Sequence, residues 1–381
     1  MDDIFYMRRA LELAQNGTGR VSPNPLVGAV IVKDGRIIGE GWHDRYGGLH
    51  AERDALEKCR EAGNDPAGAV MYVTLEPCCH HGKQPPCTDA LIEAGIRRVV
   101  VGSGDPNPKV AGKGIRILRE HGITVDEHVL GPECAALNDV FFHYIRTGRP
   151  LIVLKYAMTL DGKIAAYTGA ARWVTGEEAR DHVHRLRNRY SAILIGVNTV
   201  LNDDPLLTCR IEGGRDPLRI ICDTELRTPV TAQVVRTAER VPTLFATCSP
   251  DARRIDALTA AGCRVLKVGR KDGKVDLKDL FARLGEEGID SVLVEGGAAI
   301  AWSAVSAGVV DQVKAYIAPR IFGGETAKTP VGGRGFPAPD LGVRLDHLRV
   351  TRLGQDILVE GDVIRPAGAA PAAGTLEGGD N

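Results

Sequence analysis

Short apolar runs alternate with amphipathic segments along most of the chain, and this alternation restricts its fold more than any other feature. In the first part, strands are predicted at 27–33, 36–42, 69–74, 98–102 and 123–125, and helices at 3–16, 50–62, 87–94, 112–121 and 133–146. Asp34-Gly35 is predicted to join the first two strands as a hairpin turn. Strands that alternate with helices predict a three-layer α/β domain with a mixed sheet.

A second α/β unit is predicted after residues 146–150, where Gly148 and Pro150 separate a helix from the apolar strand Leu151–Ala157. Further strands are predicted at 191–196, 218–223, 243–247, 264–268, 290–294 and 312–318, with an antiparallel pair at 346–353 and 356–363. We therefore expect domains at 1–147 and 148–365. The tail at 366–381 is rich in Pro and Gly and lacks core residues, so we expect it to be disordered.

Composition excludes several classes of protein. The 381 residues carry a formal net charge of −1 and 5% aromatic side chains, so neither a basic footprint nor a set of stacking rings indicates a nucleic-acid partner. No run approaches the roughly 18 apolar residues of a membrane span, and the N-terminus lacks the pattern of a secretory signal. Nine cysteines in a chain without an export signal favour a reducing compartment. We expect a cytoplasmic protein.

One histidine and two cysteines form a candidate metal site. His50 opens a predicted helix, Cys78 follows the strand 69–74, and Cys87 opens another helix. One imidazole and two thiolates suit the tetrahedral coordination of Zn²⁺, and helix N-termini favour the thiolate form of cysteine. Three protein ligands leave a fourth position for water, as in catalytic rather than structural zinc sites. The sequence predicts one catalytic Zn²⁺ per chain.

Glu52 is the candidate proton carrier, because it stands two residues after His50 and can lie beside the metal without binding it. His-x-Glu followed by Pro-Cys is typical of zinc deaminases. Here the second cysteine comes nine positions after the first, and this longer loop favours a lid over the substrate. The alternative is a closed structural site, completed by Cys79, His80 or His81 as fourth ligand.

These motifs carry a resemblance to a known family. The segments NPLVGAV at 24–30, GWH at 41–43, HAE at 50–52 and TLEPCCHHGKQPPC at 74–87 resemble the deaminase half of the bifunctional riboflavin-biosynthesis deaminase–reductases. The chain departs from the family at Gln84, where Thr is usual, and at Cys79, where a small polar residue is frequent. The resemblance implies a cytidine-deaminase-like fold for the first domain.

The resemblance also implies four substrate contacts, from Asn24, His43, His80 and Lys83. Asn24 and the histidines can hydrogen-bond to the edge of a pyrimidine, and Lys83 can bind a phosphate or a ring carbonyl. Without the resemblance, Asn24-Pro25 reads as a plain turn and Lys83 as a solvated loop charge.

In the second half, polar and glycine residues follow the predicted strands, where open α/β sheets bind ligands. Gly296-Gly297 before a helix can admit a pyrophosphate, although the Gly-x-Gly-x-x-Gly fingerprint is absent and a tight turn is the alternative. Arg187 and Arg210 are candidate anchors for a substrate phosphate, with surface salt bridges as the alternative.

These segments resemble the reductase half of the same family, which implies a dihydrofolate-reductase-like α/β fold and NADPH as the cofactor. The implied cofactor residues are Ala157, Trp173, Thr199, Asp203, Gly297, Ala298, Ala299, Ile300, Ala301, Trp302 and Ser303. The implied substrate residues are Ala171, Arg187, Leu207, Arg210 and Glu295, and Lys155 is a further candidate for the active site.

The resemblance implies two successive reactions on a phosphoribosyl pyrimidine: hydrolytic removal of its 2-amino group, and then reduction of its ribosyl group to ribityl. The expected partner is this small molecule, with no nucleic acid or membrane, and the chain is expected to form a homo-oligomer. The alternative is a zinc deaminase that acts on nucleic acid or on free nucleosides, and a third reading is a binding protein with a structural zinc. Only the first predicts a reductase site in the second half.

Overall fold

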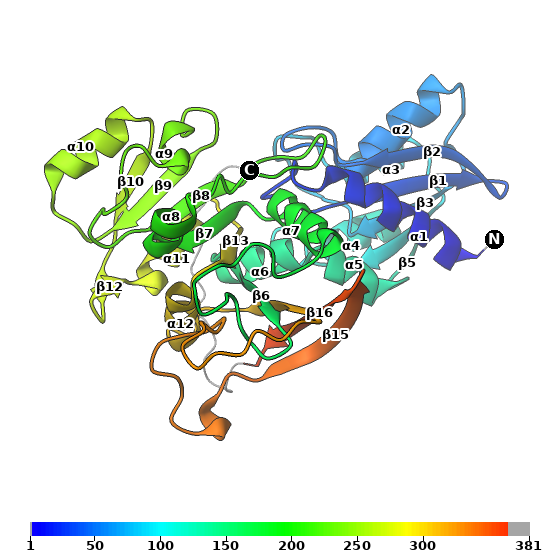
Figure 1. The fold of residues 1–381 in the computed structure, drawn as a ribbon. Helices are drawn as coiled ribbons and strands as arrows, with labels where there is room; N and C mark the ends of the chain where they lie inside the picture. Colours follow the sequence, from blue (N-terminus) through cyan, green and yellow to red (C-terminus); the bar gives the residue numbers. More distant parts are fainter. Residues whose placement is uncertain (1, 365–381) are drawn as a thin grey trace. The chain divides into compact units, whose positions relative to one another are not determined.

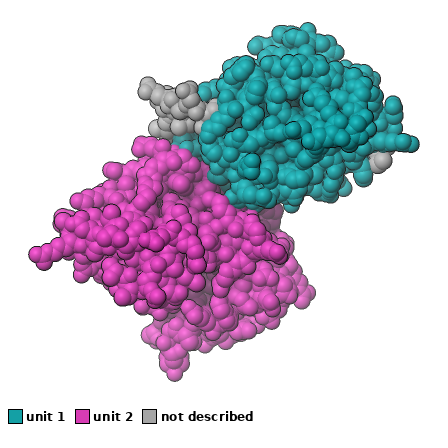
Figure 2. Space-filling view, turned by 90° about the horizontal axis from the view of Figure 1, so that it is seen from above, with its two compact units in different colours: residues 1–148, 372–381 teal, residues 149–371 magenta. Residues whose placement is uncertain are grey.

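A computed structural model describes residues 2–364. The tail predicted to be disordered, 366–381, lies outside the described residues. The described chain divides into two compact units (Figure 2). The first ends at Gly148 and the second begins at Arg149. Each unit has its own sheet and its own core.

The first unit is an α/β fold around a five-stranded mixed sheet, as expected (Figure 1). The strand order is β2-β1-β3-β4-β5, with β1 antiparallel to β2 and β3, and β3, β4 and β5 mutually parallel. Its elements are α1 (Asp3–Ala14), β1 (Gly28–Lys33), β2 (Arg36–Trp42), α2 (Ala51–Glu61), β3 (Val70–Leu75), α3 (Cys87–Glu93), β4 (Arg98–Ser103), α4 (Lys113–Glu120), β5 (Thr124–Asp126), α5 (Gly131–Leu137) and α6 (Asp139–Thr147).

Helices cover both faces of this sheet because successive strand residues point to opposite sides. Ala29 and Ile31 of β1 pack with apolar residues of α2, α3 and α4, whereas Val30 and Val32 pack with α1. Gly41 lets α2 lie directly against β2, since a Cβ at this position would come within 2.3 Å of the Ala55 nitrogen. This close contact fixes the first turn of α2.

The predicted helix 133–146 is two helices, α5 and α6, separated at Asn138. The Asn138 side chain accepts a hydrogen bond from the Leu26 nitrogen at 2.8 Å and donates one to the Leu26 oxygen at 2.9 Å. Asn138 therefore pairs with the backbone of a residue 112 positions away. Helical periodicity cannot predict such a contact, because it depends only on neighbouring residues.

The second unit is built on a nine-stranded sheet in the order β10-β9-β8-β7-β13-β6-β14-β16-β15. All neighbours are parallel except β14–β16 and β16–β15, of which β16–β15 is the predicted antiparallel pair. Its strands are β6 (Leu151–Thr159), β7 (Ala192–Gly196), β8 (Leu218–Cys222), β9 (Thr243–Thr247), β10 (Arg264–Lys267), β13 (Ser291–Glu295), β14 (Gln312–Ala318), β15 (Leu345–Leu353) and β16 (Asp356–Val363).

The helices of the second unit are α7 (Glu177–Arg189), α8 (Val197–Asp203), α9 (Gln233–Arg236), α10 (Ala252–Ala260), α11 (Leu277–Glu286) and α12 (Ala298–Ser306). On one face of the sheet, α11 and α12 cover Leu194 and Val294, and on the other, α8, α9 and α10 cover Ile193 and Ile195. A small hairpin of β11 (Arg270–Lys271) and β12 (Lys274–Val275) was not predicted. None of the described helices is long and apolar enough to cross a membrane.

Candidate active sites

The three predicted zinc ligands lie together in the first unit. His50 Nδ1 is 3.4 Å from Cys78 Sγ and 3.4 Å from Cys87 Sγ, and the three ligand atoms lie within 4.8 Å of one another. A tetrahedral zinc ion with ordinary bond lengths would place nitrogen and sulfur ligands roughly 3.5 Å apart. The donor set and its spacing therefore fit Zn²⁺.

The ends of two helices position these ligands. His50 is the N-cap residue of α2, and Cys87 is the first residue of α3. Cys78 lies in the loop after β3, where the backbone N–H of Cys87 points to its sulfur at 3.4 Å. Arg53 holds the end of this loop, because its guanidinium donates to the Pro85 and Pro86 oxygens at 3.1 and 2.7 Å. The hydrogen bond from the Cys87 side chain, and then that from His50, hold the pKa of Cys78 well below its usual value.

Glu52 lies in the first turn of α2 and is 4% exposed. Burial, and then the negative charge of Cys78, raise the pKa of Glu52 to about 7. A carboxyl group that titrates near neutrality can both accept and return a proton during one reaction cycle.

The described residues offer no fourth ligand to this group. Its members are His50, Cys78 and Cys87 among residues 2–364. The Cys79 thiol instead faces the Lys109 oxygen at 3.8 Å. The arrangement is therefore the open, three-ligand kind that catalytic zinc sites use.

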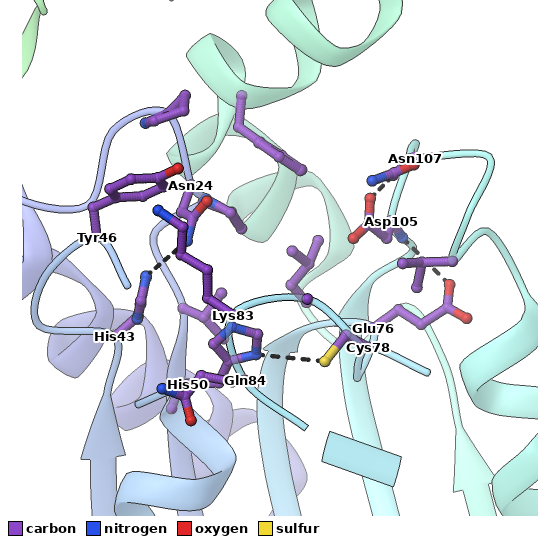
Figure 3. Close-up of a pocket in the computed structure, with 18 of the residues that line it drawn as sticks. Asn24, His43, Tyr46, His50, Glu76, Cys78, Lys83, Gln84, Asp105 and Asn107 are labelled. Carbon is purple, nitrogen blue, oxygen red and sulfur yellow. Dashed lines mark hydrogen bonds between the residues drawn. The ribbon is translucent and has the colours of Figure 1, made fainter. Parts of the chain in front are cut away.

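A cavity opens beside this cluster, and Asn24, His43 and Lys83 line it (Figure 3). His80 lines it as well. His43 is 2% exposed, with Nδ1 at 2.8 Å from the Leu49 oxygen and Nε2 at 3.1 Å from Asn24 Nδ2. A carbonyl oxygen needs a donor, so Nδ1 carries the proton and Nε2 accepts from Asn24. His43 therefore orients the Asn24 amide, and burial lowers the pKa of His43 toward this neutral state.

The loop between Cys78 and Cys87 borders the cavity. Lys83 Nζ lies 3.7 Å from the centre of the Tyr46 ring, a cation–π contact. Gln84 Nε2 donates to the Gly47 oxygen at 3.3 Å. Both contacts connect the 78–87 loop to the 44–49 loop. Gln84, where the family usually has Thr, therefore provides one of the hydrogen bonds between the two loops.

Two acidic residues that line this cavity, Glu76 and Asp105, were not predicted from the sequence. Glu76 is 4% exposed and accepts backbone N–H groups of Gly112 at 3.0 Å and Gly114 at 3.1 Å, so it caps the start of α4. Asp105 follows β4, and burial raises its pKa to about 6. Position after a strand end was the available signal for Asp105. Nothing local in the sequence marks Glu76 as a helix cap.

A second constellation lies in the second unit, around Glu295 at the end of β13. Arg187 of α7 binds both carboxylate oxygens of Glu295, at 3.0 and 2.9 Å, and also donates to the Thr208 oxygen. Lys155 Nζ of β6 is 3.9 Å from the same carboxylate. Burial alone would raise the pKa of Glu295, but Arg187 and Lys155 lower it to about 2. The predicted substrate residues Arg187 and Glu295 thus pair with each other. Burial lowers the pKa of the neighbouring Lys155 ammonium group.

Strand register extends this constellation into a row of charges. Glu295 pairs with Lys155, Lys155 with Lys314 of β14, and Lys314 with Glu360 of β16. Directly paired residues present their side chains to the same face of a sheet. Lys314 and Glu360 form an ion pair, so each lysine of the row has a carboxylate beside it.

A further cavity lies at the carboxyl ends of β7 and β8, beside the start of α12. Five of the predicted cofactor residues line it: Thr199, Gly297, Ala299, Ile300 and Ser303. Gly296 and Gly297 have φ of +81° and +52°, and a Cβ at either position would come within 3.3 Å of Thr199 Oγ1. This opening at a helix N-terminus fits the phosphates of a dinucleotide cofactor.

Other predicted cofactor residues lie outside this cavity. Ala301 is packed in the core, and Trp302 stacks edge-to-face on Phe336, with ring centroids 5.3 Å apart. Trp173 is 56% exposed, with Arg180 over its ring at 4.9 Å. The remaining ones are Ala157 on β6, Asp203 at the end of α8 and Ala298 at the start of α12.

The remaining predicted substrate residues of this unit sit on loops. Leu207 is 4% exposed with φ of +56°, whereas Ala171 and Arg210 are exposed. The fully buried Arg219 donates to the Leu206 oxygen at 3.1 Å and so supports the backbone next to Leu207.

Two family models match the chain. The cytidine and deoxycytidylate deaminase zinc-binding region matches residues 1–103, and the RibD C-terminal domain matches residues 150–359. The riboflavin biosynthesis protein RibD of Actinobacillus pleuropneumoniae is 50% identical over 366 residues, 96% of each chain. That of Bacillus amyloliquefaciens is 42% identical over 93% of this chain and 94% of its own.

Solved structures are also similar to this chain over nearly its whole length. The Thermotoga maritima diaminohydroxyphosphoribosylaminopyrimidine deaminase/5-amino-6-(5-phosphoribosylamino)uracil reductase is 40% identical, over 95% of this chain and 98% of its own, with a TM-score of 0.81. Acinetobacter baumannii RibD is 36% identical, over 95% and 99%, with a TM-score of 0.83. With the zinc cluster in one unit and the charged constellation in the other, these matches show that the chain belongs to the RibD family, the bifunctional deaminase–reductases of riboflavin biosynthesis.

Proposed function

We propose that residues 1–147 deaminate 2,5-diamino-6-(5-phosphoribosylamino)pyrimidin-4(3H)-one and that residues 148–365 reduce the resulting 5-amino-6-(5-phosphoribosylamino)uracil with NADPH. The observation that carries the proposal is the open His50, Cys78 and Cys87 cluster with buried Glu52 beside a cavity for a substrate. The second unit adds a buried, charged constellation for a second reaction.

In the first reaction, water adds to C2 of the pyrimidine and ammonia leaves, so that a carbonyl replaces the amino group. Zinc, when bound by His50, Cys78 and Cys87, supplies a Lewis acid that lowers the pKa of water. Glu52 takes one proton of the water and delivers it to a ring nitrogen. It then moves the proton of the new C2 hydroxyl group to the amino group, which leaves as ammonia while the carbonyl forms. Asn24, held by His43, orients the pyrimidine edge, and Lys83 binds its carbonyl or phosphate oxygen.

In the second reaction, hydride adds to C1′ of the ribosyl group and a proton goes to the ring oxygen, which opens the ring to ribityl. NADPH, when bound beside Gly297 and Thr199, supplies the hydride. Lys155, whose Nζ lies 3.9 Å from the Glu295 carboxylate, is the group that we propose to supply this proton. Arg210, exposed on its loop, is available for the substrate phosphate.

A single substitution tests the division of labour. In Glu52→Gln, ammonia release from the diaminopyrimidine is expected to fall by about 10²-fold or more, because no carboxylate remains to carry the proton. Oxidation of NADPH by the deaminated intermediate should be unchanged. Glu57→Gln, which alters an exposed residue of the same helix, is the matched control. Ammonia release at the wild-type rate in Glu52→Gln would contradict the assignment.

We also propose a reducing, cytoplasmic location and a homo-oligomer. All nine cysteines are free thiols, which supports the location. The edge strand β15 exposes Leu348 and Val350 by 60% and 70%, which supports self-association along this edge. Sedimentation of the wild type and of Val350→Lys measures this, and a monomeric wild type would refute the homo-oligomer.

A further inference from the structure

Tyr316 on β14 is a titratable residue that the proposed reactions do not use. Its side chain is fully buried, on the face of the sheet that carries Lys155, Glu295 and Lys314. Tyr316 follows Lys314 by two positions, and Lys314 pairs directly with Lys155 in the strand register. The tyrosine is therefore a diagonal neighbour of Lys155, at a spacing that an aromatic side chain can bridge.

The ring of Tyr316 faces the Lys155 ammonium group. Lys155 Nζ is 5.4 Å from the centre of the ring, within the range of a cation–π contact. The Glu295 carboxylate lies 3.9 Å from the same nitrogen, which is longer than a hydrogen bond. Both oxygens of this carboxylate are bound by Arg187. The carboxylate thus attracts the ammonium group without fixing its direction, and the ring restricts where that group can lie.

His182 of α7 fixes the orientation of the ring. His182 Nδ1 and Tyr316 Oη are hydrogen-bonded at 2.7 Å, and the two ring centroids lie 5.9 Å apart. A buried tyrosine hydroxyl needs such a partner, whereas a phenylalanine would fill the same space without one. Burial lowers the pKa of His182 and raises the pKa of Tyr316. Both side chains are therefore neutral at pH 7, and no charge on either opposes their hydrogen bond.

The charges on this face leave Lys155 without a carboxylate of its own. The groups around Lys155 and the carboxylate beside it come from three elements: Glu295 of β13, Arg187 and His184 of α7, and Lys314 and Tyr316 of β14. Lys314 forms an ion pair with Glu360. Glu295 is thus shared by two cations, Lys155 and Arg187. The negative face of the ring offers the ammonium group a further favourable contact.

We propose that Tyr316, held by His182, positions the Lys155 ammonium group for proton transfer in the reduction. This positioning role rests on the function proposed for Lys155 and adds two residues to that site. The ring stabilises the charged form of Lys155, which is the form that can donate a proton. Removal of the ring should therefore lower the pKa of Lys155 and move the alkaline limit of the reduction to lower pH.

The test is the pH dependence of NADPH oxidation by the full-length, zinc-loaded protein with 5-amino-6-(5-phosphoribosylamino)uracil. In Tyr316→Leu, kcat is expected to fall about tenfold while the KM for NADPH is unchanged, with the alkaline limb about one pH unit lower. Tyr316→Phe keeps the ring and should keep the wild-type limb. Phe245→Leu is the matched control, because it removes a fully buried ring on β9, which β8, β7 and β13 separate from β6. It should lose stability without any shift of the limb.

The role of His182 is tested by combining variants. His182→Leu and Tyr316→Phe remove the same hydrogen bond, and each is expected to lower kcat about threefold. The double variant should be no slower than either, because the two changes act through one bond. His182→Gln, whose amide can replace the imidazole as partner, should restore most of the rate. Losses that multiply in the double variant would overturn the role of His182.

The outcomes separate this inference from the proposed function. A lower kcat with the wild-type pH limb in Tyr316→Leu would show a structural role alone and overturn the inference, as would an equal shift of the limb in Tyr316→Phe. If Tyr316→Leu does not fold, the half-buried His182 variants and the double variant decide. Reduction at the wild-type rate in Lys155→Met would instead refute the function proposed for Lys155. A wild type that does not oxidise NADPH would refute the reductase function itself.

Discussion

At the scale of single residues, the zinc site depends on a neighbour that binds no metal. Arg53 donates to the Pro85 and Pro86 oxygens, immediately before Cys87. In Arg53→Met the loop loses both hydrogen bonds, and we expect zinc to bind about 10–100-fold more weakly, as for other supports of metal ligands. Competition with a chromophoric chelator measures this. Arg60→Met, at an exposed position of the same helix, should leave affinity unchanged, and equal affinity in both variants would contradict the role of Arg53.

The Arg187–Glu295 pair gives a prediction about pH. The folded pKa of Glu295, about 2, lies below its unfolded value near 4.5, so the pair stabilises the fold above pH 4.5 and this contribution is lost as pH falls toward 2. Glu295→Gln leaves Arg187 buried without its partner and should lower the free energy of unfolding by about 3–5 kcal/mol at pH 7. The difference in the free energy of unfolding between the wild type and Glu295→Gln should become smaller as the pH falls below 4.5.

Tryptophan fluorescence can follow the second unit alone. In a Trp42→Phe background, the remaining tryptophans, Trp173 and Trp302, both belong to that unit. Urea unfolding at several pH values then gives the free energy for each variant. Parallel loss of stability with falling pH in the wild type and Glu295→Gln would show that the carboxylate does not carry this pH dependence.

At the scale of elements, periodicity predicted the strands well, because apolar residues of a buried strand are continuous or alternate and are bounded by Gly and Pro. It failed where a side chain contacts a distant segment and thereby determines where a helix ends. Asn138 divides a predicted helix through its bonds to Leu26. The β11–β12 hairpin has only two residues in each strand and is largely exposed, so it lacks any hydrophobic pattern.

The start of α4 is a second case of distant control, and it can be tested. Glu76 accepts the N–H groups of Gly112, Gly114 and Ile115. Glu76→Ala leaves these groups without their acceptor and should cost about 1–3 kcal/mol. Amide hydrogen exchange should accelerate across α4. Glu120→Ala, at the exposed end of α4, is the control, and slow exchange at the start of α4 in Glu76→Ala would refute the capping role.

At the scale of the whole molecule, residues of both sites were named from the sequence, but the sequence grouped only His50, Cys78 and Cys87 and did not foresee how Lys155, Arg187 and Glu295 pair. His50, Cys78 and Cys87 stand at helix starts and beside a strand end, positions that sequence signals locate. The row from Glu295 to Glu360 depends instead on the order of β13, β6, β14 and β16 in the sheet. The order of strands in a sheet cannot be derived from the spacing of residues along the chain. The pairing of Arg187 with Glu295 could therefore not be predicted.

The separation of the two cores gives a prediction for metal removal. All three zinc ligands belong to the first unit, whereas Lys155, Arg187 and the cofactor cavity belong to the second, whose core clusters contain no residue of the first. Removal of zinc by a chelator should therefore abolish ammonia release and leave the reduction of added 5-amino-6-(5-phosphoribosylamino)uracil intact. One equivalent of Zn²⁺ should restore ammonia release. If NADPH oxidation fell in proportion to the zinc removed, the reductase site would depend on the metal, and the independence of the two units would be refuted.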